Sequence, residues 1–137
     1  MARDNGMRYT GPLITEDLPG GEDCWKIAVG FSFIDADGSE WPVTAGTITD
    51  GASIPRALWL IAGHPRSTTI GQAAAVHDVC YRYGRGSRAE CDARLIRGMQ
   101  VLGASWAKRQ VIRAGIRTGG WVAWRRYRRQ ERERCHL

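Results

Sequence analysis

The nine residues from Ala73 to Tyr81 constrain the fold more than any other stretch of this sequence. They place three consecutive alanines directly before the adjacent pair His77 and Asp78. Small side chains give a titratable pair little cover, so another segment must approach it closely. Neighbouring helical residues point about 100° apart, so His77 and Asp78 cannot serve the same contact and each needs its own partner. We expect this helix to carry a candidate site.

A hairpin of two helices is predicted immediately after this stretch. A Gly-Arg-Gly turn at 84–86 ends one helix, and Ser87 with Glu90 forms a capping-box pattern that starts the next. Folding back at this turn would bring Asp92 within about one helical turn of His77. A carboxylate that faces an imidazole fixes its tautomer and stabilises the imidazolium, as a general base requires. We therefore predict His77 and Asp92 as a catalytic pair.

The other two predicted contributions from this hairpin are a metal ligand and a supporting aromatic residue. Asp78 points away from His77 and is free to act as an oxygen ligand for a hard cation. Tyr81, one helical turn after His77, is predicted to pack or to form a hydrogen bond near the site.

The segment 49–56, Thr-Asp-Gly-Ala-Ser-Ile-Pro-Arg, leads from strands into the first helix. Asp50 and Gly51 are a turn signal, and Ser53 is placed to cap a helix with proline in its first turn. One interpretation is a corner whose aspartate binds backbone amides. In the other, the loop lies beside the His-Asp pair, with Asp50 as a second metal ligand and with Gly51 and Ser53 supporting the site.

The cysteines are even in number but sparse. Cys24, Cys80, Cys91 and Cys135 contain no Cys-x-x-Cys pair that would indicate zinc. The hairpin would set Cys80 against Cys91, so this is the one plausible bridge. Two buried free thiols in a reducing cytosol are the favoured interpretation, and no disulfide is predicted.

The first third of the chain, residues 7–49, is predicted to form strands. The run from Trp25 to Phe33 alternates, so that Trp25, Ile27, Val29, Phe31 and Phe33 would share one face. Asp35 to Gly38 is a turn, and an extended segment follows at Trp41. These features predict one small antiparallel sheet.

From about residue 54 to 124 the pattern is helical. The His77 helix is expected to be capped by Ser67 or Thr68 and to run to about Tyr83. The next helix is predicted from Ser87 to Leu102, and a third from about Ser105. The fold class is therefore α+β: a small N-terminal antiparallel sheet followed by a three-helix half that contains the antiparallel hairpin.

The chain has 137 residues and a net charge of +6, which suits one domain with a basic end. We assign residues 1–124 to the domain and 125–137 to an arginine-rich tail. The arginine-rich tail is compatible with three kinds of binding partner: nucleic acid, an anionic membrane surface or another protein. The residues proposed for these contacts are Trp121, Trp124, Arg125, Arg126, Arg128 and Arg129. No apolar run is long enough to span a membrane and no signal peptide is evident, so synthesis in the cytoplasm is expected.

The run Ala-Ala-Ala-x-His-Asp-x-Cys-Tyr followed by Cys-Asp resembles the active-site helix pair of the secreted phospholipase A2 superfamily, particularly its compact viral form. The resemblance implies that His77 activates a water, Asp78 binds calcium and Asp92 orients His77. The sequence lacks the glycine-rich calcium loop that usually precedes this helix. The implied activity is hydrolysis of a phospholipid or another envelope acyl ester.

A second resemblance covers roughly residues 9–124 and is carried by the Thr-Asp-Gly-Ala-Ser-Ile-Pro-Arg string and the His77 helix. It is similar to the DUF1353 family of largely bacteriophage-encoded proteins. The implied function is a virion protein of a phage tail, made in the host cytoplasm and joined to other phage structural proteins. In that case the polar cluster is either structural or the site of a small calcium-dependent hydrolase. Nucleic-acid binding through the basic tail is a third hypothesis.

Overall fold

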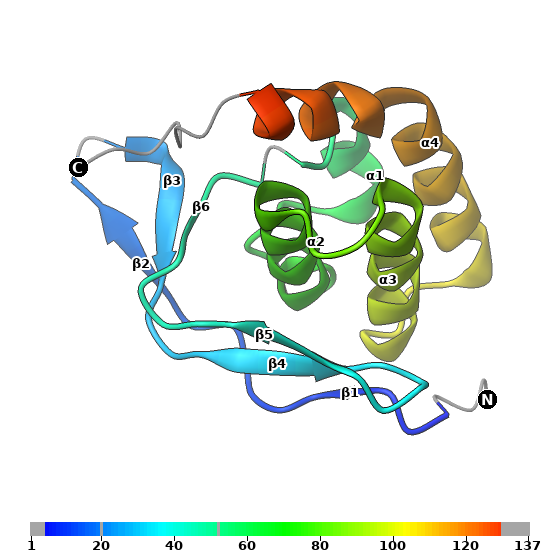
Figure 1. The fold of residues 1–137 in the computed structure, drawn as a ribbon, viewed down its shortest axis with the longest axis horizontal. Helices are drawn as coiled ribbons and strands as arrows, with labels where there is room; N and C mark the ends of the chain where they lie inside the picture. The colour runs from blue at the N-terminus through cyan, green and yellow to red at the C-terminus, as the bar shows by residue number, and fades with distance from the viewer. Residues whose placement is uncertain (1–4, 20, 52, 130–137) are drawn as a thin grey trace.

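The computed structural model describes residues 5–19, 21–51 and 53–129. Within these ranges the fold is α+β, as predicted, with short antiparallel strands in the N-terminal half and helices after them. Figure 1 shows the strands along one side of the molecule and the helices packed together on the other.

The strands form two sheets where the sequence predicted one. The first sheet has the order β1-β4-β5, and the second has the order β2-β3-β6. The strand bounds are β1 Arg8–Tyr9, β2 Thr15–Leu18, β3 Gly21–Ile27, β4 Phe31–Ile34, β5 Glu40–Val43 and β6 Ile48–Thr49. Every neighbouring pair is antiparallel.

The two sheets separate because the predicted strand from Trp25 to Phe33 is interrupted after Ile27. Val29 is 49% exposed, so the expectation that it shares a buried face with its neighbours was wrong. At Gly30, a Cβ would lie 3.2 Å from the Val43 carbonyl oxygen and 3.2 Å from the Ala45 amide nitrogen. Glycine therefore lets the backbones come close as the chain passes from one sheet to the other.

The helical half begins with a short 3-10 turn, Arg56–Leu58, and a one-turn helix, α1, Trp59–Ala62. Three longer helices follow: α2 Gly71–Tyr83, α3 Arg88–Val101 and α4 Trp106–Arg129. The capping box of α3 is confirmed, since the Ser87 hydroxyl accepts from the Glu90 amide. Helix α2 starts later than predicted and has Ile70, without a side-chain cap, at its N-cap position. Helix α4 ends at Arg129, so it includes the first five residues of the predicted tail, 125–129.

Helix α2 is the centre of the fold. All residues from Ala73 to Tyr81 are buried, including His77 and Asp78. One side of α2 packs on the sheets through Ala75, Val76 and Val79. Other residues of the helix pack on α3 and α4, and Figure 1 shows α2 enclosed between β4 and β5 below and α4 above. Buried polar groups must be hydrogen-bonded, so its His-Asp pair requires partners from the surrounding elements.

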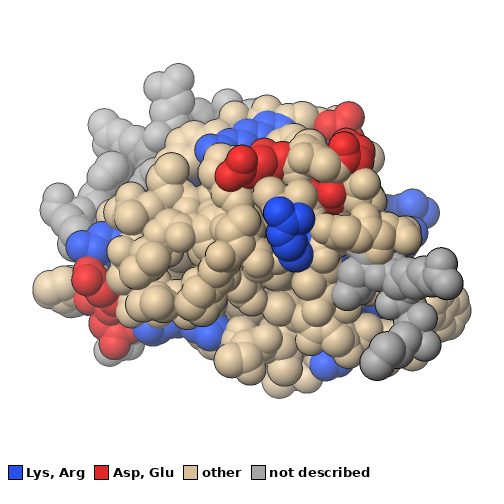
Figure 2. All heavy atoms as spheres, turned by 90° about the horizontal axis from the view of Figure 1, so that it is seen from below, with Lys and Arg blue, Asp and Glu red and all other residues tan. Residues whose placement is uncertain are grey.

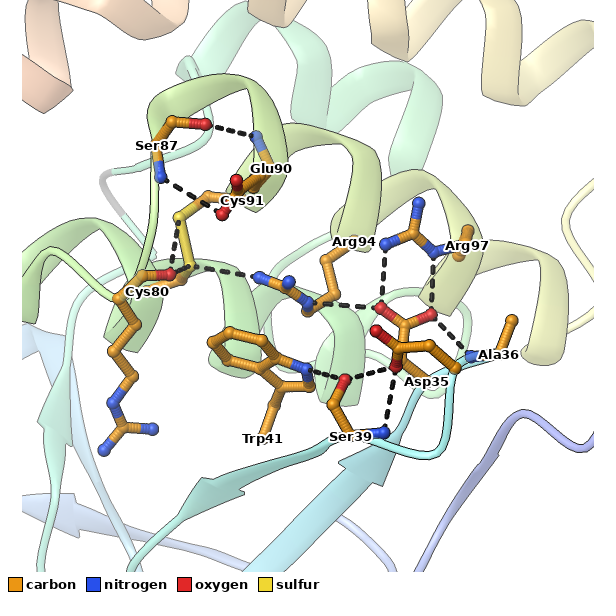
Figure 3. A network of polar contacts seen from close by, with 12 residues as sticks. Asp35, Ala36, Ser39, Trp41, Cys80, Ser87, Glu90, Cys91, Arg94 and Arg97 are labelled. Carbon is orange, nitrogen blue, oxygen red and sulfur yellow. Dashed lines mark hydrogen bonds and ion pairs between the residues drawn. A yellow bond between two sulfur atoms is a disulfide. The ribbon is translucent and has the colours of Figure 1, made fainter.

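A buried ion-pair network fastens α3 to the turn between β4 and β5. The Asp35 carboxylate accepts from Arg97 at 2.7 Å and from Arg94 at 3.3 Å. The Arg94 guanidinium also lies 3.3 Å from the ring centroid of Trp41, and Figure 3 shows it above this ring, between the sulfur of Cys80 and the carboxylate of Asp35. Burial alone would raise the pKa of Asp35, but hydrogen bonds from Arg97, the Ala36 amide and Arg94 outweigh it and hold this pKa below its ordinary value.

Cys80 of α2 and Cys91 of α3 form a disulfide, so the prediction of two free thiols was wrong. The turn at 84–86 brings their Cα atoms to 5.8 Å, which is within the range that a disulfide spans. The prediction failed because it rested on an assumed reducing compartment, whereas the geometry of the hairpin favours a bridge. Cys24 is disulfide-bonded as well, and Cys135 lies outside the described residues.

Charge is unevenly distributed over the chain. Seen from below, the side that carries β1, β4 and β5 is mostly uncharged, with acidic side chains in one group near the top and another at the left, and with scattered basic side chains (Figure 2). In contrast, α4 contains eight lysines and arginines and no aspartate or glutamate. None of the described helices has the length and apolar character needed to cross a membrane.

Candidate active site

The hairpin of α2 and α3 brings His77 and Asp92 into direct contact. Nε2 of His77 lies 2.8 Å from Oδ1 of Asp92. The His77 side chain is buried, whereas the Asp92 side chain is 20% exposed. The Cys80–Cys91 disulfide joins the same two helices, three residues after His77 and one residue before Asp92. The bridge therefore constrains the geometry of the pair.

Tyr81 supports this pair from one turn further along α2. Its hydroxyl donates to Oδ1 of Asp92 at 2.5 Å, and its ring centroid lies 4.2 Å from that of His77. Burial raises the pKa of Tyr81, and the hydrogen bond to Asp92 raises it further. The phenol therefore stays protonated and remains a donor to the carboxylate.

The second ring nitrogen of His77 contacts Ser53. The Ser53 hydroxyl oxygen lies 3.0 Å from Nδ1, and both residues are buried. With Asp92 accepting from Nε2–H, Nδ1 is left to accept from the Ser53 hydroxyl. Ser53, His77 and Asp92 thus form a continuous chain of hydrogen bonds from three separate elements.

Asp78 points away from His77, as predicted, and its carboxylate is fully surrounded by protein donors. Oδ2 accepts from the Thr49 hydroxyl and pairs with Arg82 at 3.2 Å. Oδ1 accepts from the Tyr127 hydroxyl at 3.1 Å. Arg82 in turn donates to the Ile48 carbonyl.

The loop after β6 does lie beside α2. Asp50 is buried, and its Oδ1 lies 3.5 Å from the same Tyr127 hydroxyl that contacts Asp78. Gly51 has a φ of +67°, which suits glycine, and its carbonyl accepts from the Ile54 amide. Of the loop residues predicted for the site, Ser53 contacts His77 and Asp50 lies near Asp78, whereas Gly51 lies against Pro65 and Trp25.

The two predicted metal ligands, Asp50 and Asp78, are close together, but their surroundings do not fit a calcium ion. A dication would have to displace the Arg82 guanidinium and two hydroxyl donors from Asp78. Among the described residues, no group of three or more histidines, cysteines, aspartates and glutamates is arranged to share a metal. Calcium stays a prediction, and no step below depends on it.

The sequence did not predict that residues of α4 pack on the site. The Trp124 ring packs edge-on against Tyr81 with centroids 5.2 Å apart. At Gly120, a Cβ would lie 2.8 Å from the Tyr81 hydroxyl, so glycine permits the close approach of α4. The pairing of Arg82 with Asp78 at i and i+4 was visible in the sequence, whereas Tyr127 carried no local signal.

The residues predicted to contact a partner differ in their exposure to solvent. Trp121 is 46% exposed, and the Arg125 guanidinium lies 5.3 Å from its ring centroid. Trp124 and Arg126 are half-buried, and the Arg126 guanidinium faces the Tyr127 ring. The side chains of Arg128 and Arg129, and the whole of residues 130–137, lie outside the described structure.

Comparisons with known proteins identify relatives of this chain. Two proteins of Sinorhizobium fredii (strain NBRC 101917 / NGR234) are similar to it, and both are described as uncharacterized. Protein y4jT is 43% identical over 54 residues, which cover 39% of this chain and 16% of the relative. Protein y4iH is 35% identical over 78 residues, which cover 56% of this chain and 33% of the relative. The chain therefore spans a third or less of the length of each of these relatives.

No solved structure matches the chain significantly. A family model described as "Protein of unknown function (DUF1353)" matches residues 25–116, which is more than half of the chain. This range contains Ser53, His77, Tyr81 and Asp92, and so the whole hydrogen-bonded chain around His77. The protein belongs to the DUF1353 family.

Proposed function

We propose that this protein is a small hydrolase of acyl esters in which His77 is the general base and Asp92 orients it. The observation that carries the proposal is the 2.8 Å contact between Nε2 of His77 and the Asp92 carboxylate. This contact leaves Nδ1 as the basic nitrogen, and a hydroxyl already lies 3.0 Å from it. A base of this kind typically contributes about 10²- to 10⁴-fold to a hydrolytic rate.

The attacking oxygen would lose its proton to Nδ1 of His77. Among the described residues, Ser53 is the one whose hydroxyl contacts this nitrogen, so we assign the attack to the Ser53 hydroxyl in place of the activated water expected from the sequence. The proton taken by His77 would pass to the leaving alcohol, and a water would then hydrolyse the acyl-serine with His77 again as base. Asp92, which accepts a hydrogen bond from the Tyr81 hydroxyl, would stabilise the imidazolium that forms in each step.

The class of substrate rests on the resemblance to the phospholipase A2 superfamily. The helix pair supplies a histidine, a distal aspartate and a tyrosine in mutual contact, and these contacts support that resemblance. We therefore propose a phospholipid acyl ester as the substrate. A place in a phage tail, joined to other phage structural proteins, is proposed on the family resemblance alone.

Opening of the site is part of the proposal. Ser53 and His77 are buried, and the C-terminal half of α4 packs through Gly120 and Trp124 on Tyr81, the residue whose ring contacts His77. A substrate would reach Nδ1 only after this part of α4 moved. Detergent micelles or vesicles, which favour exposure of the Trp121 face, are therefore included in the test.

The test is release of fatty acid from mixed phospholipid vesicles by the wild-type protein and by His77→Gln, with and without a chelator. The proposal predicts activity in the wild type that survives the chelator and is lost in the variant. Loss on chelation with recovery on added calcium would instead support the cation predicted from the sequence. If wild type and His77→Gln are both folded and release fatty acid only at the background rate, the proposal that the protein is a hydrolase is wrong. The buried cluster would then be a structural hydrogen-bond network.

A further inference from the structure

A cavity of about 140 Å³ lies between α3 and α4, next to the His77 site. It is roughly tenfold larger than the space that one water needs. Its walls combine arginines, one carboxylate and apolar side chains. The lining residues used here are Arg88, Asp92, Ile96, Arg113, Ile116 and Arg117. Asp92 belongs both to this cavity and to the pair with His77.

The cavity carries a surplus of positive charge. Three guanidinium groups face one carboxylate, and α4 supplies no acidic residue at all. Arg113 and Arg117 are separated by one helical turn and so lie on the same side of α4. Within the described ranges, none of the three arginines forms an ion pair with a carboxylate.

Asp92 does not neutralise these cations through a direct contact. Its Oδ1 already accepts from Tyr81 and contacts His77. The Arg88 side chain is hydrogen-bonded to Tyr81, and its Nη1 is a buried atom without a hydrogen-bond partner in the described part of the chain. The arginines that line the cavity therefore have no carboxylate partner among the described residues, which favours an anionic ligand there.

The shape and chemistry of the cavity favour a phosphate attached to an apolar group. Guanidinium groups present forked donors that match phosphate oxygens. Ile96 and Ile116 provide an apolar wall beside them. We infer that this cavity binds the phosphate of a phospholipid and holds the neighbouring hydrocarbon against the two isoleucines.

The inference deepens the proposed function and rests on it for the role of the ligand as a substrate. A phosphate held by Arg113 and Arg117 would occupy the cavity that Asp92 also lines, and Asp92 contacts His77. The arginines would then position the substrate without taking part in proton transfer. Binding itself is measurable whether or not hydrolysis occurs.

The experiment compares three full-length proteins: wild type, the double variant Arg113→Gln with Arg117→Gln, and the control Arg8→Gln with Arg56→Gln. All four arginines are exposed, so both double variants should fold and both remove two positive charges. Binding is measured by calorimetry with monomeric dihexanoyl phosphatidylglycerol, with inorganic phosphate and with phosphatidylglycerol vesicles. A single-stranded oligonucleotide is the fourth probe.

We expect the cavity variant to bind the short phospholipid at least tenfold more weakly than wild type, while the control binds it within about twofold. Inorganic phosphate should bind more weakly than the short lipid but show the same dependence on Arg113 and Arg117. If vesicles bind and the short lipid does not, or if both double variants weaken binding equally, the site is a diffuse basic surface and the inference is wrong. Binding of the oligonucleotide in preference to the lipid would likewise overturn it.

Kinetics separate this inference from the proposed function. In a hydrolytically active protein, the cavity variant should raise KM for the short lipid at least tenfold with a much smaller change in kcat. Hydrolysis with an unchanged KM would reject the phosphate site and keep the hydrolase. If the wild type binds the short lipid tightly through Arg113 and Arg117 but does not hydrolyse it, the phosphate site is supported and the proposed hydrolase function is wrong.

Discussion

Ser53 and Asp92 lie at opposite nitrogens of the His77 ring, Ser53 at 3.0 Å from Nδ1 and Asp92 at 2.8 Å from Nε2. The two residues come from a loop after the second sheet and from α3, and they meet only across the central helix. An imidazole held at both nitrogens has a fixed orientation and a fixed tautomer. Proton transfer from the serine toward the carboxylate-supported ring then needs no rearrangement of His77.

The Ser53→Ala variant tests the assignment of the attacking oxygen. We predict loss of at least about 10²-fold in hydrolysis, because His77 would keep its carboxylate but lose the hydroxyl that it activates. The wild type should also be labelled at Ser53 by a fluorophosphonate, as read by mass spectrometry of its peptides. Unchanged hydrolysis in Ser53→Ala would assign the attack to a water and leave His77 as the base.

Removing the Tyr81 hydroxyl should weaken the orientation of Asp92 while preserving the packing of the ring on His77 and Trp124. For Tyr81→Phe we predict a loss of about 1–2 kcal/mol in the free energy of unfolding, since one hydrogen bond to a charged group disappears. Hydrolysis should fall by about tenfold, which corresponds to a similar free energy at the transition state. Tyr83→Phe is the control, because Tyr83 is 56% exposed. Equal effects of the two variants would contradict a specific role for Tyr81.

The Cys80–Cys91 bridge closes a short loop, with a separation of 11 residues. The double variant Cys80→Ser with Cys91→Ser should lose about 3 kcal/mol in the free energy of unfolding, as the chain-entropy model gives for loops of roughly this size. Urea unfolding without reductant provides the measurement. Cys24 is also disulfide-bonded, so this variant isolates the hairpin bridge better than reduction of the wild type does. An unchanged unfolding midpoint would show that the hairpin is held without the bridge.

Asp35 should make the stability of the fold sensitive to acid. The pKa of Asp35 is lower in the folded protein than in the unfolded chain, where it is about 3.9. Ionised Asp35 therefore adds its full contribution to the free energy of unfolding above the unfolded pKa, and this contribution is lost as the pH falls through the lower folded pKa. Wild type should therefore lose stability below about pH 4 more steeply than Asp35→Asn. At neutral pH this variant should cost about 3 kcal/mol, because the buried Arg94 loses its carboxylate.

Urea unfolding at a series of pH values would check both parts of this prediction. Asp37→Asn removes an exposed carboxylate from the same turn and should cost less at neutral pH. If Asp35→Asn and wild type show parallel losses in acid, Asp35 is not the residue responsible for the sensitivity.

The sequence predicted the helical part of the site because its determinants are local. The turn at 84–86 and the Ser87 capping box fixed the hairpin, and the hairpin fixed the meeting of His77 with Asp92. The split of the sheet was hidden because the alternation from Trp25 to Phe33 continues through the bend at Gly30.

The partners of Asp78 illustrate what local patterns leave out. Arg82 lies four residues away and could have been inferred from helical spacing. Tyr127 lies 49 residues from Asp78, and its contact depends on how α4 crosses the site. Spacing in the sequence carries no information about such a crossing, so the predicted open cation ligand is an engaged carboxylate in the structure.

The most direct test of the account is a double-variant cycle in which fatty-acid release is measured for wild type, His77→Gln, Asp92→Asn and the double variant. Residues that act as one unit give strongly non-additive losses. We predict that each single variant loses at least about 10²-fold and that the double variant is no slower than His77→Gln alone. Additive losses, or a wild type that releases no fatty acid while remaining folded, would contradict the claim that His77 and Asp92 form a catalytic pair.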